Sequence, residues 1–283
     1  MSLLQLFIIS VIQGITEWLP ISSSGHVLLA ADYFALDGRD EALINVMAHV
    51  GTLFAVLLYF WREIAHAAAG APALIAAPLS RRPLSDNSRL ALNIITSTPI
   101  ALIAIALYQV LLDDGVKDMM RSVWVVGATS IIFGLALWWA DVKGGRDKTQ
   151  ADMPVRDAVM IGATQAVAAL LPGTSRSGIT MTAARALGYS RTEAARFSML
   201  IGAPILAASG FYALLELTQA ADGDGLVTLN DGLIVAGLSF ASGFLSIWAL
   251  MALLQRISFL PFVIYRIIFG AILLLGAPYL GLA

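Results

Sequence analysis

Residues 13–26 read Gln13-Gly-Ile-Thr-Glu17-Trp-Leu-Pro20-Ile-Ser22-Ser23-Ser24-Gly25-His26, so an acid, a proline and three serines lie within an otherwise apolar region, 3–36. A region of this length enters a bilayer, and Pro and Gly break its helix near the middle. Irregular backbone at membrane depth persists only where protein or a water-filled cavity surrounds it. The stretch therefore predicts a re-entrant helix-turn-helix hairpin whose turn carries function.

A second stretch, Pro172-Gly173-Thr174-Ser175-Arg176-Ser177-Gly178-Ile-Thr180, interrupts the apolar region 155–188 in a similar way. Gln13 precedes Pro20 by seven residues, and Gln165 precedes Pro172 by seven residues. Three further apolar spans follow each region, so the second half must be inverted relative to the first. Inverted repeats whose broken helices meet near the midplane occur in transport-type folds. Chance similarity among apolar helices is the alternative.

The composition requires a membrane environment. The 283 residues are 59% hydrophobic and 13% charged, whereas a soluble domain is about 25% charged. We predict an all-α integral membrane protein with an inverted-topology repeat, about six full transmembrane helices and two re-entrant helix-turn-helix hairpins. Residues 1–283 would form a single membrane domain, with half-repeats 1–141 and 152–283. The expected full spans are 42–61, 90–112, 122–140, 197–218, 231–254 and 260–281.

The basic residues favour one orientation. Twelve lie in the connections on one predicted face, and three lie on the other. The twelve are Arg62, Arg81, Arg82, Arg89, Lys143, Arg146, Lys148, Arg156, Arg185, Arg191, Arg196 and Arg256, and the three are Arg39, Lys117 and Arg121. By the positive-inside rule the richer face is cytoplasmic. Both termini are therefore expected outside, with the long connection 62–89 in the cytoplasm.

The first turn offers oxygen ligands and a nucleophile. Gln13 and Glu17 are four residues apart on a helix, so their oxygens face the same way and suit Mg²⁺ or Ca²⁺. Ser22–Ser24 lie where a second helix begins, and the free N–H groups of such an end favour an anion. Taken alone, these serines would be helix caps. Ser23 and His26 place a hydroxyl beside a base, and either could attack phosphorus.

The second turn is cationic and rich in hydrogen-bond donors. Its glycines allow close approach of a ligand, and the Arg176 fork matches phosphate oxygens. Ser175, Ser177 and Thr180 add hydroxyls. An ion pair between Glu17 and Arg176 that only bridges the turns is the structural alternative, because both charges are costly at membrane depth. Together, the two turns favour phosphoryl transfer by positioning and charge neutralisation.

The two stretches closely resemble the signature motifs of the undecaprenyl-diphosphatase family, the bacitracin-resistance lipid phosphatases. The resemblance extends over nearly the whole chain, including Pro261-Phe-Val-Ile-Tyr-Arg266 in the last span. It implies hydrolysis of undecaprenyl diphosphate to undecaprenyl phosphate and inorganic phosphate, in the bacterial cytoplasmic (inner) membrane. Recycling of this carrier serves peptidoglycan and other cell-wall glycan synthesis.

The resemblance also implies roles for individual residues. Glu17, Ser23, His26 and Arg176 would be catalytic, and a divalent cation, Mg²⁺ or Ca²⁺, would bind Glu17 and Gln13. Many members carry Glu where this chain has Gln13, which weakens that ligand assignment. The substrate-binding residues would be Ser22, Ser24, Gly25, Gly173, Thr174, Ser175, Ser177 and Thr180. The implied partners are a polyprenyl diphosphate lipid and membrane lipids, with no nucleic acid, and a homodimer is compatible with the family.

A transporter or flippase of a polyprenyl phosphate or other anionic lipid is the main alternative, since the inverted repeat suits it. Another membrane phosphatase superfamily has Ser-Gly-His and Ser-Arg elements but needs a later catalytic histidine, and no His follows His66. His49 is expected mainly to pack. Arg266 is expected to meet substrate or a structural carboxylate. Trp18 is expected to be an interface anchor.

Overall fold

The computed structural model describes residues 2–34, 38–80, 84–145, 147–219 and 228–280, and within these ranges it is helical without β-strands. Arg81, Arg82 and Arg146 of the charge count lie outside the described residues, and so does the side chain of Arg39. The all-α class predicted from the sequence is confirmed.

Six helical segments are long and apolar enough to cross a membrane, so the chain is a multi-pass membrane protein. The expected number of spans is confirmed. The spans belong to α3 (Gly38–Tyr59), α5 (Asp86–Ser97) with α6 (Pro99–Leu111), α8 (Val123–Lys143), α12 (Arg191–Gln219), α13 (Leu229–Leu254) and α14 (Leu260–Leu280). Pro99 starts α6 and removes a helical hydrogen bond, which explains the break inside the second span.

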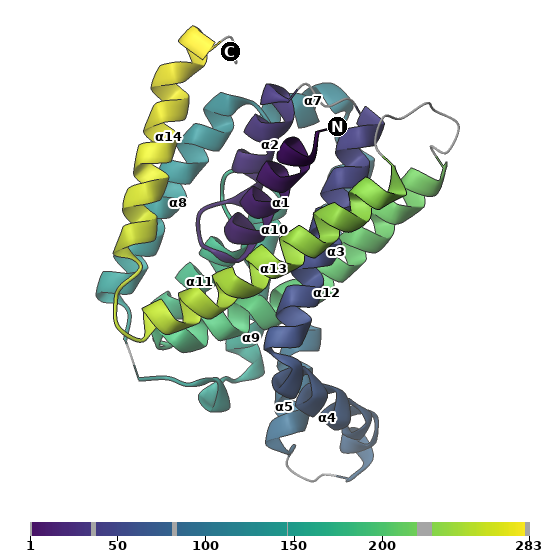
Figure 1. The fold of residues 1–283 in the computed structure, drawn as a ribbon. Coiled ribbons are helices and arrows are strands. Elements are labelled where there is room, and N and C mark those ends of the chain that lie inside the picture. The colour runs from purple at the N-terminus through teal and green to yellow at the C-terminus, as the bar shows by residue number, and fades with distance from the viewer. Residues whose placement is uncertain (1, 35–37, 81–83, 146, 220–227, 281–283) are drawn as a thin grey trace.

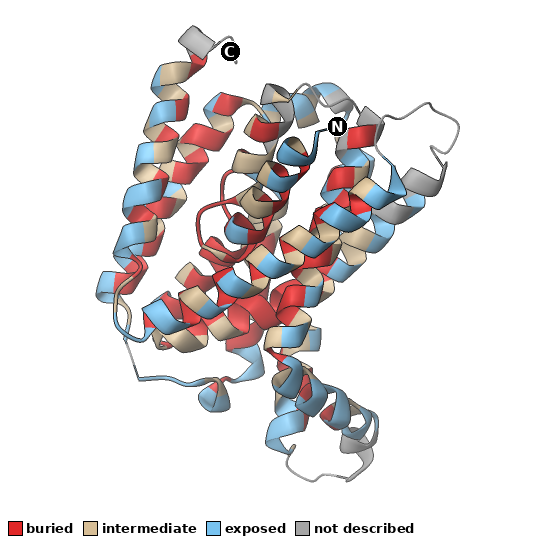
Figure 2. Cartoon of the chain, in the orientation of Figure 1, coloured by how far each residue is buried: buried red, intermediate tan, exposed pale blue. Residues whose placement is uncertain are grey.

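Two shorter helical hairpins lie between these spans. The first consists of α1 (Leu3–Trp18) and α2 (Ser23–Tyr33), and the second of α9 (Val155–Ala163), α10 (Gln165–Leu170) and α11 (Arg176–Ala186). In Figure 1 the first hairpin starts at the face that holds both chain ends, and the second starts at the opposite face. Their turns approach each other in the middle of the bundle, where Figure 2 shows buried backbone. This arrangement brings the two polar stretches together.

The connection 62–89 contains a helix that was not expected. It is α4 (Trp61–Ser80), which packs against α5 and projects with it from the face opposite the chain ends (Figure 1). A Cβ atom at Gly70 would lie only 2.4 Å from the backbone of Asn87, so this helix pair needs a glycine at its contact. The short helix α7 (Asp114–Met120) lies on the face of the chain ends.

Each hairpin is supported by a different part of the bundle. The arm α1 packs against α13, and the arms α9 and α10 pack against α5 and α6. A Cβ atom at Gly14 would lie 1.9 Å from Ser242 Oγ, which shows how closely α1 approaches α13. Small residues allow such close packing of helices in lipid, where no hydrophobic effect drives their association.

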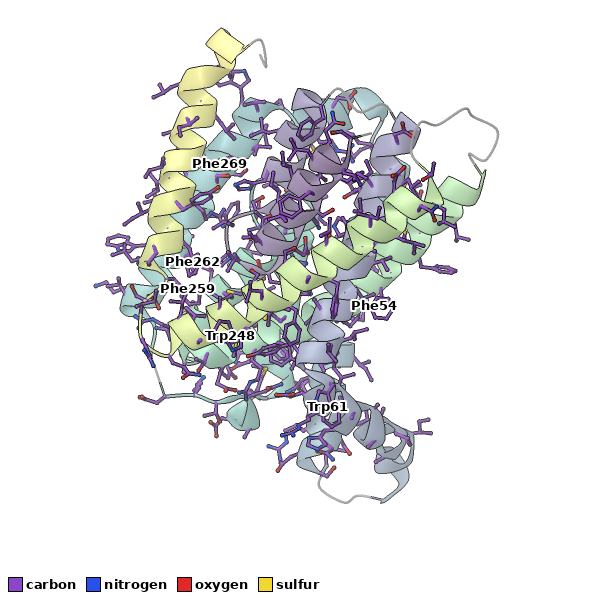
Figure 3. The ribbon with its side chains drawn as sticks, viewed as in Figure 1. Phe54, Trp61, Trp248, Phe259, Phe262 and Phe269 are labelled. Carbon is purple, nitrogen blue, oxygen red and sulfur yellow. The ribbon has the colours of Figure 1, made fainter. Side chains whose placement is uncertain are left out.

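Large apolar side chains cover the outside of the bundle. Phe54, Trp61 and Trp248 project from it in Figure 3, and each is more than half exposed, as expected for lipid-facing groups. Phe259, by contrast, is fully buried. The expectation that Trp18 is an interface anchor is wrong: it is 0% exposed, because it ends α1 beneath the second turn and packs in the main core.

Candidate active site

Each of the two turns contains a serine with a positive φ angle. Ser22 has φ of 75° and Ser175 has φ of 67°, and these are the only non-glycine residues with positive φ in the described ranges. The left-handed conformation costs a side chain about 1–2 kcal/mol, and such strain is common at functional sites. In each turn the next residue begins the returning arm, Ser23 in α2 and Arg176 in α11.

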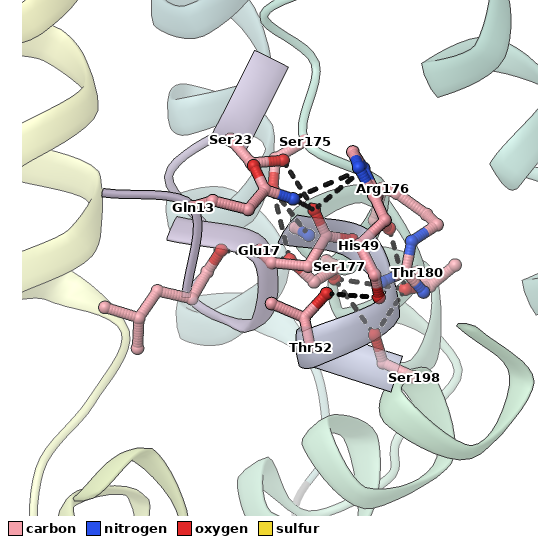
Figure 4. A network of polar contacts seen from close by, with 12 residues as sticks. Gln13, Glu17, Ser23, His49, Thr52, Ser175, Arg176, Ser177, Thr180 and Ser198 are labelled. Atoms are coloured by element: carbon pink, nitrogen blue, oxygen red, sulfur yellow. Dashed lines mark hydrogen bonds and ion pairs between the residues drawn. The ribbon is translucent and has the colours of Figure 1, made fainter. Parts of the chain in front are cut away.

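Glu17 connects the two turns. Ser23 Oγ donates a hydrogen bond of 2.7 Å to its Oε2, and Arg176 Nη2 donates one of 3.0 Å to its Oε1. Gln13 Nε2 also donates to Oε2, at 3.1 Å (Figure 4). The Glu17 side chain is 5% exposed, so its charge depends on these partners. The cross-turn ion pair considered from the sequence is therefore present, and a serine hydroxyl shares the same carboxylate.

A cavity of about 240 Å³ opens beside this carboxylate. Its polar lining comes from the two turns, α1, α3, α10 and α12, and its apolar lining comes from α6, α10 and α12. The polar residues are Glu17, Ser22, Ser23, Ser24, His49, Gln165, Ser175, Arg176 and Ser209, and the apolar ones are Ala101, Ile105, Ala168, Ala169, Ile205 and Leu206. A polar end with apolar walls suits a phosphate group that carries a lipid tail.

Arg176 is held from three sides. It binds Glu17 through Nη2, its guanidinium carbon lies 5.1 Å from the centre of the Trp18 ring, and Nη1 lies against Gly202 of α12. A Cβ atom at Gly202 would come within 1.6 Å of Nη1, so only glycine leaves room for this position of the arginine. Nη1 is buried and has no hydrogen-bond partner among the described residues.

The two histidines near the turns, His26 and His49, lie in different environments. The ring of His26 stacks on Phe269 at 4.2 Å, its Nδ1 donates to Ser22 O at 2.7 Å, and its Nε2 accepts from Tyr265 Oη at 2.5 Å. His26 is not part of the lining of the cavity, and both of its ring nitrogens are engaged away from Ser23. The spacing of Ser23 and His26 on one helix gave no information on which way the ring would turn.

His49, which was expected mainly to pack, does line the cavity. Its Nδ1 donates to Asn45 O at 2.7 Å, so the Nε2 lone pair is the acceptor of a hydrogen bond from the Gln13 side-chain amide. Nε2 lies 3.2 Å from Gln13 Nε2 and 3.9 Å from Glu17 Oε2. The neighbouring Gly51 and Thr52 in the sequence could not predict that His49 lines the cavity. Its approach to Glu17 depends on how α3 packs against α1.

The other hydroxyls of the second turn mostly have partners within the protein. Ser175 Oγ accepts from Gly178 N at 3.1 Å and caps α11, and Ser177 Oγ donates to Leu19 O at 3.0 Å. Thr180 Oγ1 lies 2.6 Å from Ser198 Oγ. Thr174 is fully buried, and its Oγ1 has no partner in the described part of the chain.

Three further residues predicted to bind substrate, Ser24, Gly25 and Gly173, also hold the turns and helices close together. Ser24 Oγ accepts from Gly173 N at 3.4 Å, which joins the two turns directly. Gly173 has φ of 84°, and a Cβ atom there would come 2.2 Å from Thr129 Oγ1. A Cβ atom at Gly25 would come 2.9 Å from Val126 Cγ1, so this glycine allows α2 to pack on α8.

Among the described residues Arg266 neither lines the cavity nor binds a carboxylate, contrary to expectation. It is 0% exposed, and all the acceptors recorded for it are backbone carbonyls. They include Pro20 O of the first turn, at 3.4 Å, and Gly173 O of the second turn, at 3.0 Å. One guanidinium therefore holds both turns.

Comparison with known proteins agrees with this arrangement. The family model of the bacitracin resistance protein BacA matches residues 6–272, which include both turns, the first five spans and most of the sixth. The chain belongs to this family. A relative from Hyphomonas neptunium named undecaprenyl-diphosphatase is 57% identical over 279 residues, which cover 98% of each chain. Proteins of the same name from a Jannaschia species and from Ruegeria pomeroyi are 46% and 43% identical, over 98% and 99% of this chain and 99% and 100% of their own lengths. The family match thus covers nearly the whole bundle.

Proposed function

We propose that this protein hydrolyses undecaprenyl diphosphate to undecaprenyl phosphate and inorganic phosphate in the bacterial inner membrane. The observation that carries the proposal is the shared carboxylate of Glu17, which binds a serine hydroxyl of one turn and the arginine of the other. Membership of the BacA family and the names of its relatives support the same substrate. The apolar walls of the cavity suit the prenyl chain next to the diphosphate.

In the proposed first step Ser23 Oγ attacks the terminal phosphorus and the bond from phosphorus to the bridging oxygen breaks. Glu17 Oε2, 2.7 Å from Oγ, takes the serine proton, and undecaprenyl phosphate leaves. Arg176 neutralises the developing charge on the phosphate oxygens. Water then attacks the phosphoserine, its oxygen bonds to phosphorus and the bond from phosphorus to Oγ breaks. Glu17 returns the proton to Ser23 Oγ, and inorganic phosphate leaves as dihydrogen phosphate with both protons of the water.

His26 remains the alternative nucleophile. In the alternative, its Nε2 would attack phosphorus after leaving the hydroxyl of Tyr265. Ser23 is favoured because its hydroxyl already binds a carboxylate that lines the cavity, whereas both ring nitrogens of His26 have other partners. In either case the ring of His26 supports the start of α2 through its bond to Ser22 O.

A divalent cation is proposed on the first-turn side. The donor types suit one: Glu17 Oε2 and His49 Nε2 lie 3.9 Å apart, and Gln13 Nε2 donates to both of them. A cation would replace this N–H bridge, with the Gln13 amide turned to present its oxygen. No group of three His, Cys, Asp or Glu side chains capable of holding a metal occurs among the described residues, so an amide and substrate oxygens would complete the shell. When bound, the cation would supply positive charge to the phosphate oxygens. Gln13 and Glu17 would hold it as expected from the family, with His49 as a third ligand.

The test is phosphate release from a C55 polyprenyl diphosphate by purified wild type, Glu17→Gln and Arg176→Ala, with and without a chelator. We expect release by the wild type that the chelator reduces and both substitutions abolish. A well-folded wild type that releases no phosphate would contradict the hydrolase and favour transport of the anionic lipid through the same two turns.

A further inference from the structure

The proposed mechanism leaves one buried side chain of the cavity unused. Gln165 begins α10, is 2% exposed and lines the cavity together with Arg176. Neither its Nε2 nor its Oε1 has a hydrogen-bond partner in the described part of the chain. A buried amide without partners is costly, and native proteins retain one where a ligand or water completes its hydrogen bonds.

The equivalent position of the first hairpin shows that this state is not imposed by depth in the membrane. Gln13 stands seven residues before Pro20, as Gln165 stands seven before Pro172, and it is just as buried at 1% exposed. Its Nε2, however, donates to Glu17 Oε2 at 3.1 Å. The first-turn amide is therefore bound within the protein, and the second-turn amide is not.

Arg176 resembles Gln165 in having a buried polar group without a hydrogen-bond partner. Its Nη2 binds Glu17, while its buried Nη1 has no partner among the described residues. Both residues line one cavity, so an N–H donor of an amide and an N–H donor of a guanidinium are left unpaired on its second-turn side. Phosphate oxygens accept such donors, and a guanidinium beside an amide is suited to a group with several oxygens.

We propose that Gln165 is a substrate-contacting residue that donates from Nε2 to a non-bridging oxygen of the diphosphate, beside Arg176. Ionised phosphate oxygens donate no hydrogen bond, so Oε1 accepts from a water molecule, which any hydrolysis must admit to the cavity. The proposal rests on the proposed function and assigns the phosphate-binding half of the site to α10 as well as to the second turn.

The test compares Gln165→Leu and Gln165→Glu with the wild type, using inorganic pyrophosphate as the probe. Its affinity is measured by direct titration and as a competitive inhibitor of phosphate release, and thermal unfolding is followed in the same detergent. We expect Gln165→Leu to lower both the pyrophosphate affinity and kcat/KM about 10- to 100-fold, because this is the effect of losing one hydrogen bond to a charged group. Gln165→Glu should lose more, because its carboxylate repels the anion.

Stability separates a binding role from a structural one. Because Gln165→Leu removes an unpaired amide, it should unfold at the same temperature as the wild type or at a higher one. Asn93→Leu is the control: Asn93 is a buried amide at 1% exposed, outside the cavity, whose Nδ2 donates to Met153 O at 3.0 Å while its Oδ1 has no partner among the described residues. It should lower the unfolding temperature and leave the pyrophosphate affinity unchanged.

Unchanged pyrophosphate affinity in Gln165→Leu would overturn the proposal, as would a lowered unfolding temperature or a variant that cannot be recovered folded. A wild type that binds pyrophosphate but releases no phosphate from the lipid would contradict the hydrolase, and direct titration would still test the Gln165 contact.

Discussion

The two turns have the same backbone form but differ in how their key polar side chains are hydrogen-bonded. Each places a serine at positive φ directly before its returning helix, Ser22 before α2 and Ser175 before α11. In the first turn Glu17 accepts from Gln13 and Ser23, and only the indole Nε1 of the neighbouring Trp18 is buried without a partner among the described residues of this stretch. In and beside the second turn several groups are buried without partners, namely Gln165, Thr174 Oγ1 and Arg176 Nη1.

This difference indicates a division of labour. A cluster that is already hydrogen-bonded is positioned for proton transfer before a ligand arrives, which is the requirement for a nucleophile and its base. A cluster of unpaired groups is instead completed by the ligand, which is the requirement for binding. Substitutions in the first turn should therefore lower mainly kcat, and substitutions around the second turn should weaken mainly the affinity for phosphate groups.

The largest expected effect is that of Ser23→Ala. It removes the hydroxyl that Glu17 orients, so kcat for phosphate release should fall roughly 1,000-fold or more. Affinity for inorganic pyrophosphate should change little, because Arg176 and the second turn are intact. Steady-state kinetics with a C55 polyprenyl diphosphate and a parallel pyrophosphate titration measure both quantities. Full turnover in this variant would rule out the serine nucleophile.

A smaller effect is expected from Gly202→Ala. The new Cβ would come within 1.6 Å of Arg176 Nη1, so the arginine must move away from the cavity wall and kcat/KM should fall about 10- to 100-fold with the loss of a charged hydrogen bond. Gly210→Ala on the same helix is the matched control, since its Cβ would meet nothing within 4 Å. Equal effects of the two substitutions would mean that helix flexibility, rather than the position of Arg176, is responsible.

His49→Gln should weaken metal binding about 10-fold, through the loss of one ligand. With Mn²⁺ as the probe, electron spin echo spectra of the wild type should show nitrogen modulation, and His49→Gln should lose it. His26→Gln serves as the control and should retain the modulation, whatever its effect on turnover, because its ring stacks on Phe269 outside the cavity. Modulation that survives His49→Gln would remove this residue from the cation site.

The smallest effect is expected for Ser24→Ala. This substitution loses the 3.4 Å hydrogen bond from Gly173 N, a long contact between two turns that Arg266 also joins. We expect kcat/KM to fall about 2- to 5-fold, in keeping with a weak neutral hydrogen bond. A loss as large as that of Ser23→Ala would show that Ser24 takes part in the chemistry itself.

Hydropathy was enough to predict the six spans and the two broken hairpins, because the bilayer fixes both the length and the polarity of what crosses it. It gave no indication of α4, because Arg62, Glu63 and His66 and two prolines interrupt its alanine-rich sequence, which therefore lacks the pattern of a span. The helix is held by contact with α5, which depends on the close approach at Gly70. The half-repeat boundaries remain a prediction.

Within the site, the sequence predicted which residues take part better than it predicted where their side chains point. The motifs identified Glu17, Ser23 and Arg176, and these three side chains do meet. Sequence spacing did not reveal that His26 faces α14 while His49 faces the cavity, because the direction of a side chain is set by the packing of its helix against others. The unpaired state of Gln165 could not be inferred either, since its spacing matches that of a bonded counterpart.

Arg266 has a consequence for how the protein is made. It follows Pro20 by 246 residues and Gly173 by 93, yet it donates to the carbonyls of both. At about 5–20 residues per second, translation separates the first turn from this donor by roughly 12 to 50 s. During that interval the Pro20 carbonyl is without its guanidinium partner, inside a bundle that is still being inserted. The junction of the two turns, where we propose the active site, is therefore among the last parts of the protein to be completed on the ribosome. A chain that stops before α14 carries both signature motifs without the residue that joins them.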